Sequence, residues 1–222
     1  MRKALLPLAI AVSALWQAAL GAKPHETMGW TLNQTGSYMG KQTMYISPFG
    51  FRMSSDNLST IVRNSDESVF LCSAKKKKYC RMTYAIWSKQ FHPQSGNAKT
   101  NAPDSRQIKK GKTGVVAGLK AVQYMFSNIE NGKLRVTEEY WCADPSEIPP
   151  KCSKALSDLA NFPVDFGTPL RLIKINANMS RVTALDTLSC KKGPLADSVF
   201  DYPQGYQQAK DQFSVLLDDS GL

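Results

Sequence analysis

The feature that most constrains the fold is an alternation of apolar and polar residues through the first half of the chain. Between residues 41 and 47, Met44 and Ile46 fall on one face of an extended segment, and Thr43 and Tyr45 fall on the other. A period of two residues is typical of a β-strand with one buried face. Short segments of this kind, separated by turn residues, predict an antiparallel meander with strands at 30–35, 41–47, 51–53, 58–63, 68–74 and 79–82.

The second half of the chain repeats the strand pattern and adds helices. Further strands are predicted at 114–126, 133–142, 169–175 and 181–189. Apolar residues at helical spacing predict helices at 83–91 and 153–161, and a closing amphipathic helix that begins at Tyr206. The segment 92–112 is polar throughout and predicts a long loop inside the domain. The expected fold class is therefore mainly β (α+β), a curved antiparallel sheet with a few helices covering its open side.

The first 22 residues have the organisation of a secretory signal peptide. Arg2 and Lys3 precede an apolar run of 17 residues, and small residues follow it. The alternative is a retained membrane anchor, but a spanning helix needs roughly 20 apolar residues. Lys23 stands where a lipoprotein would carry its acylated cysteine. We expect a signal peptide at 1–22 and a single domain at 23–222, periplasmic or secreted, with no transmembrane helix in the mature chain.

The basic charge of the chain limits its partners. The formal net charge is +10, and it falls to +8 when Arg2 and Lys3 are removed with the signal. Export argues against nucleic acid as a partner. An anionic membrane surface remains a candidate partner for the four lysines at 75–78, which are predicted to form a hairpin tip. The alternative is that these lysines are simply solvated.

Five cysteines lie beyond the signal, at positions 72, 80, 142, 152 and 190. In an oxidising compartment close pairs are expected to be bridged, which predicts disulfides Cys72–Cys80 and Cys142–Cys152 and leaves Cys190 over. A three-residue loop at 75–77 would place Cys72 directly opposite Cys80. Because the chain has no CxxC motif and only two histidines, no metal site is predicted.

No residue pattern specifies a reaction. His25 and His92 lie in segments predicted to be irregular, and neither accompanies a nucleophile elbow. Glu138 and Glu139 are adjacent, and on a strand they would point to opposite faces, which makes them a weak signal for a catalytic carboxylate pair. The sequence therefore predicts no catalytic residue and no cofactor.

Met and aromatic side chains are spread over successive predicted strands. Most of them are expected in the core, but a strongly curved sheet with helices on its open side also leaves room for an apolar cavity. The candidate cavity residues are Met44, Ile46, Phe51, Met53, Leu71, Met82, Trp87, Tyr124 and Trp141.

Several short motifs, in order along the chain, resemble an uncharacterised family of exported bacterial proteins related to the lipoprotein carriers LolA and LolB. They are YMGK at 38–41, SPFGFRM at 47–53, IVR at 61–63, VFL at 69–71, GKT at 111–113, VAGLK at 116–120, EYW at 139–141, GTPL at 167–170 and FDYPQGY at 200–206. The resemblance spans roughly residues 30–217. It implies an incomplete β-barrel in which helices plug a hydrophobic cavity for acyl chains, and it implies no catalytic residue and no cofactor. The cysteines and the segment 92–112 depart from the family pattern.

The function predicted from these features is the binding or carriage of a lipid or another hydrophobic ligand, without catalysis. The partner would be a lipid or a lipidated protein. An envelope protein–protein interaction module is the first alternative, and an extracytoplasmic hydrolase is the second.

Overall fold

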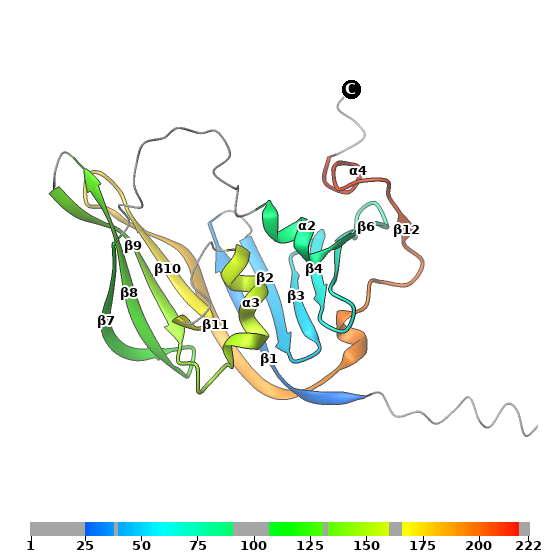
Figure 1. Ribbon diagram of the computed structural model, residues 1–222, viewed down its shortest axis with the longest axis horizontal. Coiled ribbons are helices and arrows are strands. Elements are labelled where there is room, and N and C mark those ends of the chain that lie inside the picture. The colour runs from blue at the N-terminus through cyan, green and yellow to red at the C-terminus, as the bar shows by residue number, and fades with distance from the viewer. Residues whose placement is uncertain (1–24, 38–39, 91–106, 131–132, 160–165, 218–222) are drawn as a thin grey trace, which may run out of the picture.

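The computed structural model describes residues 25–37, 40–90, 107–130, 133–159 and 166–217 (Figure 1). The predicted signal peptide lies outside these residues, as does most of the predicted polar loop. In the part of the chain that is described, no helix is long and apolar enough to cross a membrane.

Strands dominate the structure. The strands are β1 (Glu26–Gly36), β2 (Gly40–Ser47), β3 (Gly50–Ser54), β4 (Leu58–Arg63), β5 (Ser68–Ser73), β6 (Lys78–Thr83), β7 (Gln107–Val116), β8 (Leu119–Glu130), β9 (Lys133–Ala143), β10 (Pro169–Ile175), β11 (Arg181–Ala196) and β12 (Gln207–Gln208). The helices are α2 (Tyr84–Lys89), α3 (Pro150–Leu159), α4 (Phe213–Leu216) and the 3-10 helix η2 (Asp197–Phe200). The predicted class, mainly β with a few short helices, is confirmed.

All twelve strands form one sheet, in the order β12-β6-β5-β4-β3-β2-β1-β11-β10-β9-β8-β7. Every neighbouring pair is antiparallel except β12 with β6. The two end strands, β12 and β7, do not pair with each other, so the sheet curls but stays open (Figure 1). Strands β7 to β10 lie on the left of Figure 1, strands β2 to β6 on the right, and helices α2 and α3 in front of the right-hand strands.

The face of the sheet that carries α2 and α3, here called the inner face, holds the largest part of the core. Alternation places Phe51 and Val62 opposite each other on β3 and β4, and both are buried. Trp87 of α2 and Ala155 of α3 belong to the same cluster, so the helices cover this face of the sheet. Thr83 begins α2 by accepting a hydrogen bond from the backbone N–H of Ile86 at 3.3 Å, which is a typical N-cap.

The opposite face of β3 to β6, the outer face, is covered by the C-terminal segment. Ile61 and Phe70 lie opposite each other on β4 and β5, and Phe200 of η2 packs against them, fully buried. Tyr202 stacks on Tyr79 of β6, with ring centroids 4.4 Å apart. In Figure 1 this segment runs in orange and red along the right-hand side of the sheet. This half of the sheet is therefore packed on both faces.

The hairpin of β7 and β8 was not predicted, because the sequence pattern indicated a single strand at 114–126. The chain reverses at Ala117 and Gly118, which both have positive φ (50° and 83°). Two consecutive residues with positive φ match the two-residue turn that fits the twist of a hairpin. The usual Asn-Gly or Asp-Gly pair is replaced by Ala-Gly here, so the turn carried no recognisable signal. Strand β7 also begins at Gln107, so residues 107–112 of the predicted loop are strand.

The prediction of a closing amphipathic helix from Tyr206 was wrong. Gln207 and Ala209 donate backbone hydrogen bonds to Lys77 and Tyr79, at 2.9 and 2.7 Å, which keeps this segment extended along the edge of β6. Only the four residues of α4 are helical there. The apolar spacing was compatible with a helix, but pairing with a distant strand determines the backbone.

Neither predicted disulfide forms, because no bond joins Cys72 to Cys80 or Cys142 to Cys152. In the β5–β6 hairpin, Ser73 pairs with Lys78, Cys72 with Tyr79 and Leu71 with Cys80. The loop therefore has four residues instead of three. A shift of one residue moves a side chain to the other face of a sheet, so Cys72 and Cys80 point to opposite faces. Cys142 and Cys152 are both buried, but they belong to different clusters of the core.

Candidate functional site

A cleft of about 390 Å³ lies between α3 and the inner face of the sheet, beside α2. It is lined by Phe51, Val62, Arg63, Asn64, Glu67, Tyr84, Cys152, Lys154 and Ala155. These residues come from β3, β4, the turn after β4, α2 and α3. The cleft therefore depends on the packing of helices against strands that are up to about 100 residues away in the chain.

The floor of the cleft is apolar. Phe51 and Val62 are only 1% and 3% exposed, and Ala155 covers them from α3 at 5%. Because Ala155 has a small side chain, α3 leaves space above the Phe51 ring, where a larger residue would fill the cleft. Cys152 precedes it by one helical turn and lines the same space.

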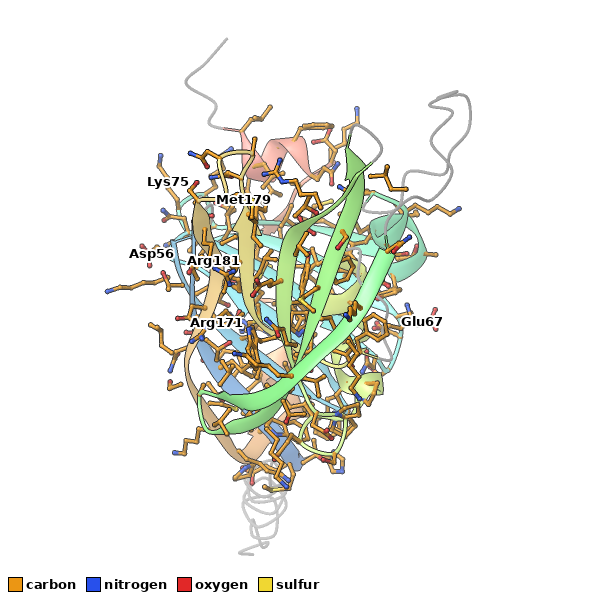
Figure 2. All side chains as sticks on the ribbon, turned by 90° about the vertical axis from the view of Figure 1, so that its left-hand side faces the viewer. Asp56, Glu67, Lys75, Arg171, Met179 and Arg181 are labelled. Carbon is orange, nitrogen blue, oxygen red and sulfur yellow. The ribbon has the colours of Figure 1, made fainter. Side chains whose placement is uncertain are left out.

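The rim of the cleft is charged, and its cations are held by carboxylates. The Arg63 guanidinium donates to Asp66 at 2.6 Å and to Asp201 at 3.0 Å. The hydrogen bond from Arg63 holds the pKa of the Asp66 carboxyl well below its usual value. Glu67 lies at the same turn with a φ of 51° and an exposed side chain, which Figure 2 labels at the periphery of the molecule.

A second set of polar contacts joins the two helices at the rim. The Tyr84 hydroxyl of α2 donates to Asp158 Oδ2 of α3 at 2.5 Å, and Lys154 Nζ donates to the same oxygen at 2.9 Å. The Lys154 ammonium also lies 4.4 Å from the centroid of the Tyr84 ring. Burial, together with the hydrogen bond to Asp158, raises the pKa of the Tyr84 phenol far above its usual value. Tyr84 is therefore a neutral donor that fixes α3 over the sheet.

Two other hollows differ from this cleft in chemistry. An apolar hollow of about 190 Å³ lies at the inner face near α4 and is lined by Met53, Ser55, Leu58, Thr60, Leu71 and Leu216. A wider groove of about 730 Å³ is lined mainly by polar side chains of β1 to β3, among them Asn33, Lys41, Thr43 and Arg52. The 390 Å³ cleft combines an apolar floor with polar groups at its mouth and lies in the size range of roughly 300–1,000 Å³ that small-molecule sites occupy.

The structure separates the nine candidate cavity residues into groups. Phe51 lines the 390 Å³ cleft, and Met53 and Leu71 line the smaller hollow. Other candidates belong to the core cluster of the inner face, to which Trp87 contributes from α2, namely Met44, Ile46, Met82, Trp87 and Trp141. Tyr124 lies apart from these, stacked on Phe166 with ring centroids 4.3 Å apart. Of the α3 residues in the cleft, Cys152 was considered only for a disulfide, and Ala155 carried no signal because an alanine in a predicted helix looks like an ordinary packing residue.

The residues considered for catalysis are not assembled into a site. His25 is exposed, and its ring lies 4.9 Å from that of Phe49. His92 lies outside the described residues. Glu138 and Glu139 point to opposite faces of β9, as predicted. Glu139 is the buried one of the two and is held by both guanidinium nitrogens of Arg181 at 2.7 Å.

No metal site is found in the described part of the chain, where no three His, Cys, Asp or Glu side chains are placed to hold an ion.

Comparison with known proteins gives distant structural likenesses only. No family model and no curated protein match the chain. An uncharacterised conserved protein from Thermus thermophilus aligns with a TM-score of 0.45 at 9% identity, over 90% of this chain and 98% of its own. MucB aligns with 0.39 at 12% identity, over 90% of this chain and 66% of MucB. A LolA superfamily protein from Nitrosomonas europaea aligns with 0.25 at 10% identity, over 86% of this chain and 97% of its own. At these TM-scores the likenesses carry no argument about function.

Proposed function

We propose that this protein binds an apolar or amphiphilic molecule, such as an acyl chain, in the cleft between α3 and strands β3 and β4. In this proposal the protein is a non-catalytic carrier outside the cytoplasm, and its own curled, open sheet is the incomplete barrel. The observation that supports this proposal is the combination of a buried apolar floor at Phe51 and Val62 with a polar rim at Arg63, Tyr84 and Lys154. The signal-like segment 1–22 supports export.

The size of the cleft fits this role. Burying one methylene group contributes about 0.8 kcal/mol, so six methylenes contribute about 5 kcal/mol before the costs of association. Because the costs of association offset much of this gain, the expected binding is weak and reversible, which suits a molecule that must release its cargo. Because Arg63 and Lys154 already have carboxylate partners, the rim recognises a head group through hydrogen bonds and adds little net attraction for an anion.

A fluorescent apolar probe, 1-N-phenylnaphthylamine, tests the proposal. Ala155→Trp places a large ring in the cleft, and Ala85→Trp is the matched control because Ala85 is exposed on α2 and does not line the cleft. We expect the first variant to bind the probe about tenfold more weakly, a loss of about 1.4 kcal/mol, and the second to bind like the unmodified protein. Thermal melts of both variants show whether they are folded. Equal binding by two folded variants would place the ligand elsewhere.

A further inference from the structure

Strand β7 ends the sheet with an unoccupied edge. It runs for ten residues, from Gln107 to Val116, and pairs with β8. Among the described residues no strand pairs with its other side. Such an edge presents a row of backbone N–H and C=O groups that can hydrogen-bond to another extended chain.

Basic side chains concentrate on this edge. Lys109, Lys110 and Lys112 are all exposed, and none of them forms an ion pair with a described residue. Lys109 and Lys110 are consecutive, so they point to opposite faces of the strand. An added strand would therefore meet positive charge on both of its own faces. No acidic residue lies on β7 itself.

Glu139, the buried carboxylate of β9, forms its ion pair with Arg181 and not with these lysines. Glu139 accepts two hydrogen bonds from Arg181 and one from Gln123, and the hydrogen bonds from Arg181 lower the pKa of its carboxyl below the usual value. Lys112 instead lies over the Trp141 ring, 5.8 Å from its centroid. Figure 2 brings this side of the molecule to the viewer, with the green strands across the front and Arg181 labelled. Lys112 and Lys110 attract the carboxylates of Glu139 and Asp144, but neither lysine forms an ion pair with a described residue, so both can still pair with a partner.

We propose that the β7 edge binds an extended, acidic segment of a partner protein, which adds to the sheet as a further strand. Like charges directly opposite each other destabilise a strand pair, so the lysines oppose the pairing of two copies of β7 and favour an acidic chain. A lipid head group could satisfy the charges, but it could not match hydrogen-bonding groups at strand spacing. The apolar side chains of Ile108 and Val115, 39% and 70% exposed, flank the lysines and offer contacts to such a strand.

This surface is separate from the apolar cleft, so the inference does not depend on the proposed ligand. The other end of the sheet is not available in the same way, because Gln207 and Gln208 of β12 already pair with Lys78 and Tyr79 of β6. A partner strand is therefore expected at the β7 edge and not at the β6 edge.

Synthetic peptides test the inference. The probe is a peptide of about ten residues built from repeated Glu-Glu-Val-Thr, a length that matches an ordinary strand. It is compared with the same peptide carrying lysine for glutamate and with a copy whose alternate backbone amides are N-methylated. We expect the acidic peptide to bind at least about tenfold more tightly than either control, by fluorescence anisotropy. Amide hydrogen exchange should slow in β7 when the peptide binds.

Variants of the full chain complete the test. Lys109→Glu, Lys110→Glu and Lys112→Glu together should weaken peptide binding about tenfold or more. Lys41→Glu, Lys89→Glu and Lys210→Glu make the same change in net charge at exposed positions elsewhere, and should leave binding nearly unchanged. Equal binding of the N-methylated peptide would show attraction by charge alone and would overturn the inference. A preference for anionic vesicles over the peptide would also overturn the inference, and so would a dimer formed through β7.

Discussion

The two edges of the sheet are protected in different ways. At the β6 edge the C-terminal segment covers the sheet, because Phe200 fills the outer face, β12 pairs with β6 and α4 packs beside it. At the β7 edge no described segment covers the strand, and lysines stand along it. Where β12 pairs with Lys78 and Tyr79, the β6 edge is already occupied, whereas the lysines of β7 oppose pairing with a second copy and still allow a strand of opposite charge. The comparison indicates that β6 belongs to the scaffold and that β7 is available for interaction.

The largest loss of stability is expected when the C-terminal segment that covers the β6 half of the sheet is weakened. Phe200→Ala removes a fully buried ring between Ile61 and Phe70 and should lower the free energy of unfolding by about 3–5 kcal/mol. Phe213→Ala is the matched control, because that side chain is 61% exposed, and it should change stability by no more than about 0.5 kcal/mol. Urea denaturation measures both. Equal, small losses would mean that the C-terminal segment does not hold this half of the sheet.

A smaller effect is expected in the β7 half, at the Glu139–Arg181 pair. Glu139→Gln keeps the shape but removes the charge, and should cost about 1–2 kcal/mol, since Arg181 is half exposed and its pairing is partly screened. The pKa of Glu139 is lowered in the folded protein, so its stabilisation is complete above the usual carboxyl pKa of about 4.3 and is lost as the pH falls through the folded value. The unfolding free energy of the unmodified protein should fall more steeply between about pH 5 and pH 3 than that of the variant.

The smallest effect concerns the thiols of the β5–β6 hairpin. Cys72 and Cys80 point to opposite faces, and burial raises the pKa of the Cys72 thiol to about 11, which makes it a poor nucleophile at neutral pH. Reductant should therefore leave the melting temperature unchanged, and peptide mapping without reduction should find both thiols free. A Cys72–Cys80 peptide would show instead that the hairpin has the three-residue loop that the sequence suggested.

The sequence predicted elements whose signal is local. The strand Leu58–Arg63 was predicted with its observed bounds, because turn residues flank it on both sides. A helix was predicted over 83–91 because Tyr84, Trp87 and Phe91 follow helical spacing, and α2 forms at Tyr84–Lys89. These features depend on residues within a few positions of each other, which is the range over which spacing is informative.

Features set by distant pairing were missed. The segment from Tyr206 has helical spacing, but hydrogen bonds to the edge of β6 make it extended. The register of the β5–β6 hairpin differs by one residue from the prediction, which moves a cysteine to the other face. Of the cleft, the sequence indicated Phe51 as a cavity residue but not Ala155 or Lys154. A cleft depends on the distance at which a helix packs on a sheet, and no short sequence pattern encodes that distance.

The most direct test of the central claim, that the α3 cleft holds an apolar ligand, is native mass spectrometry of protein recovered from the envelope of its own cells. The account predicts a bound lipid or other apolar molecule at one per chain, released by mild activation. It predicts that Ala155→Trp, expressed in the same cells, loses this mass while the exposed control Ala85→Trp keeps it. A ligand retained equally by both folded variants, or a chain that never carries one, would contradict the account.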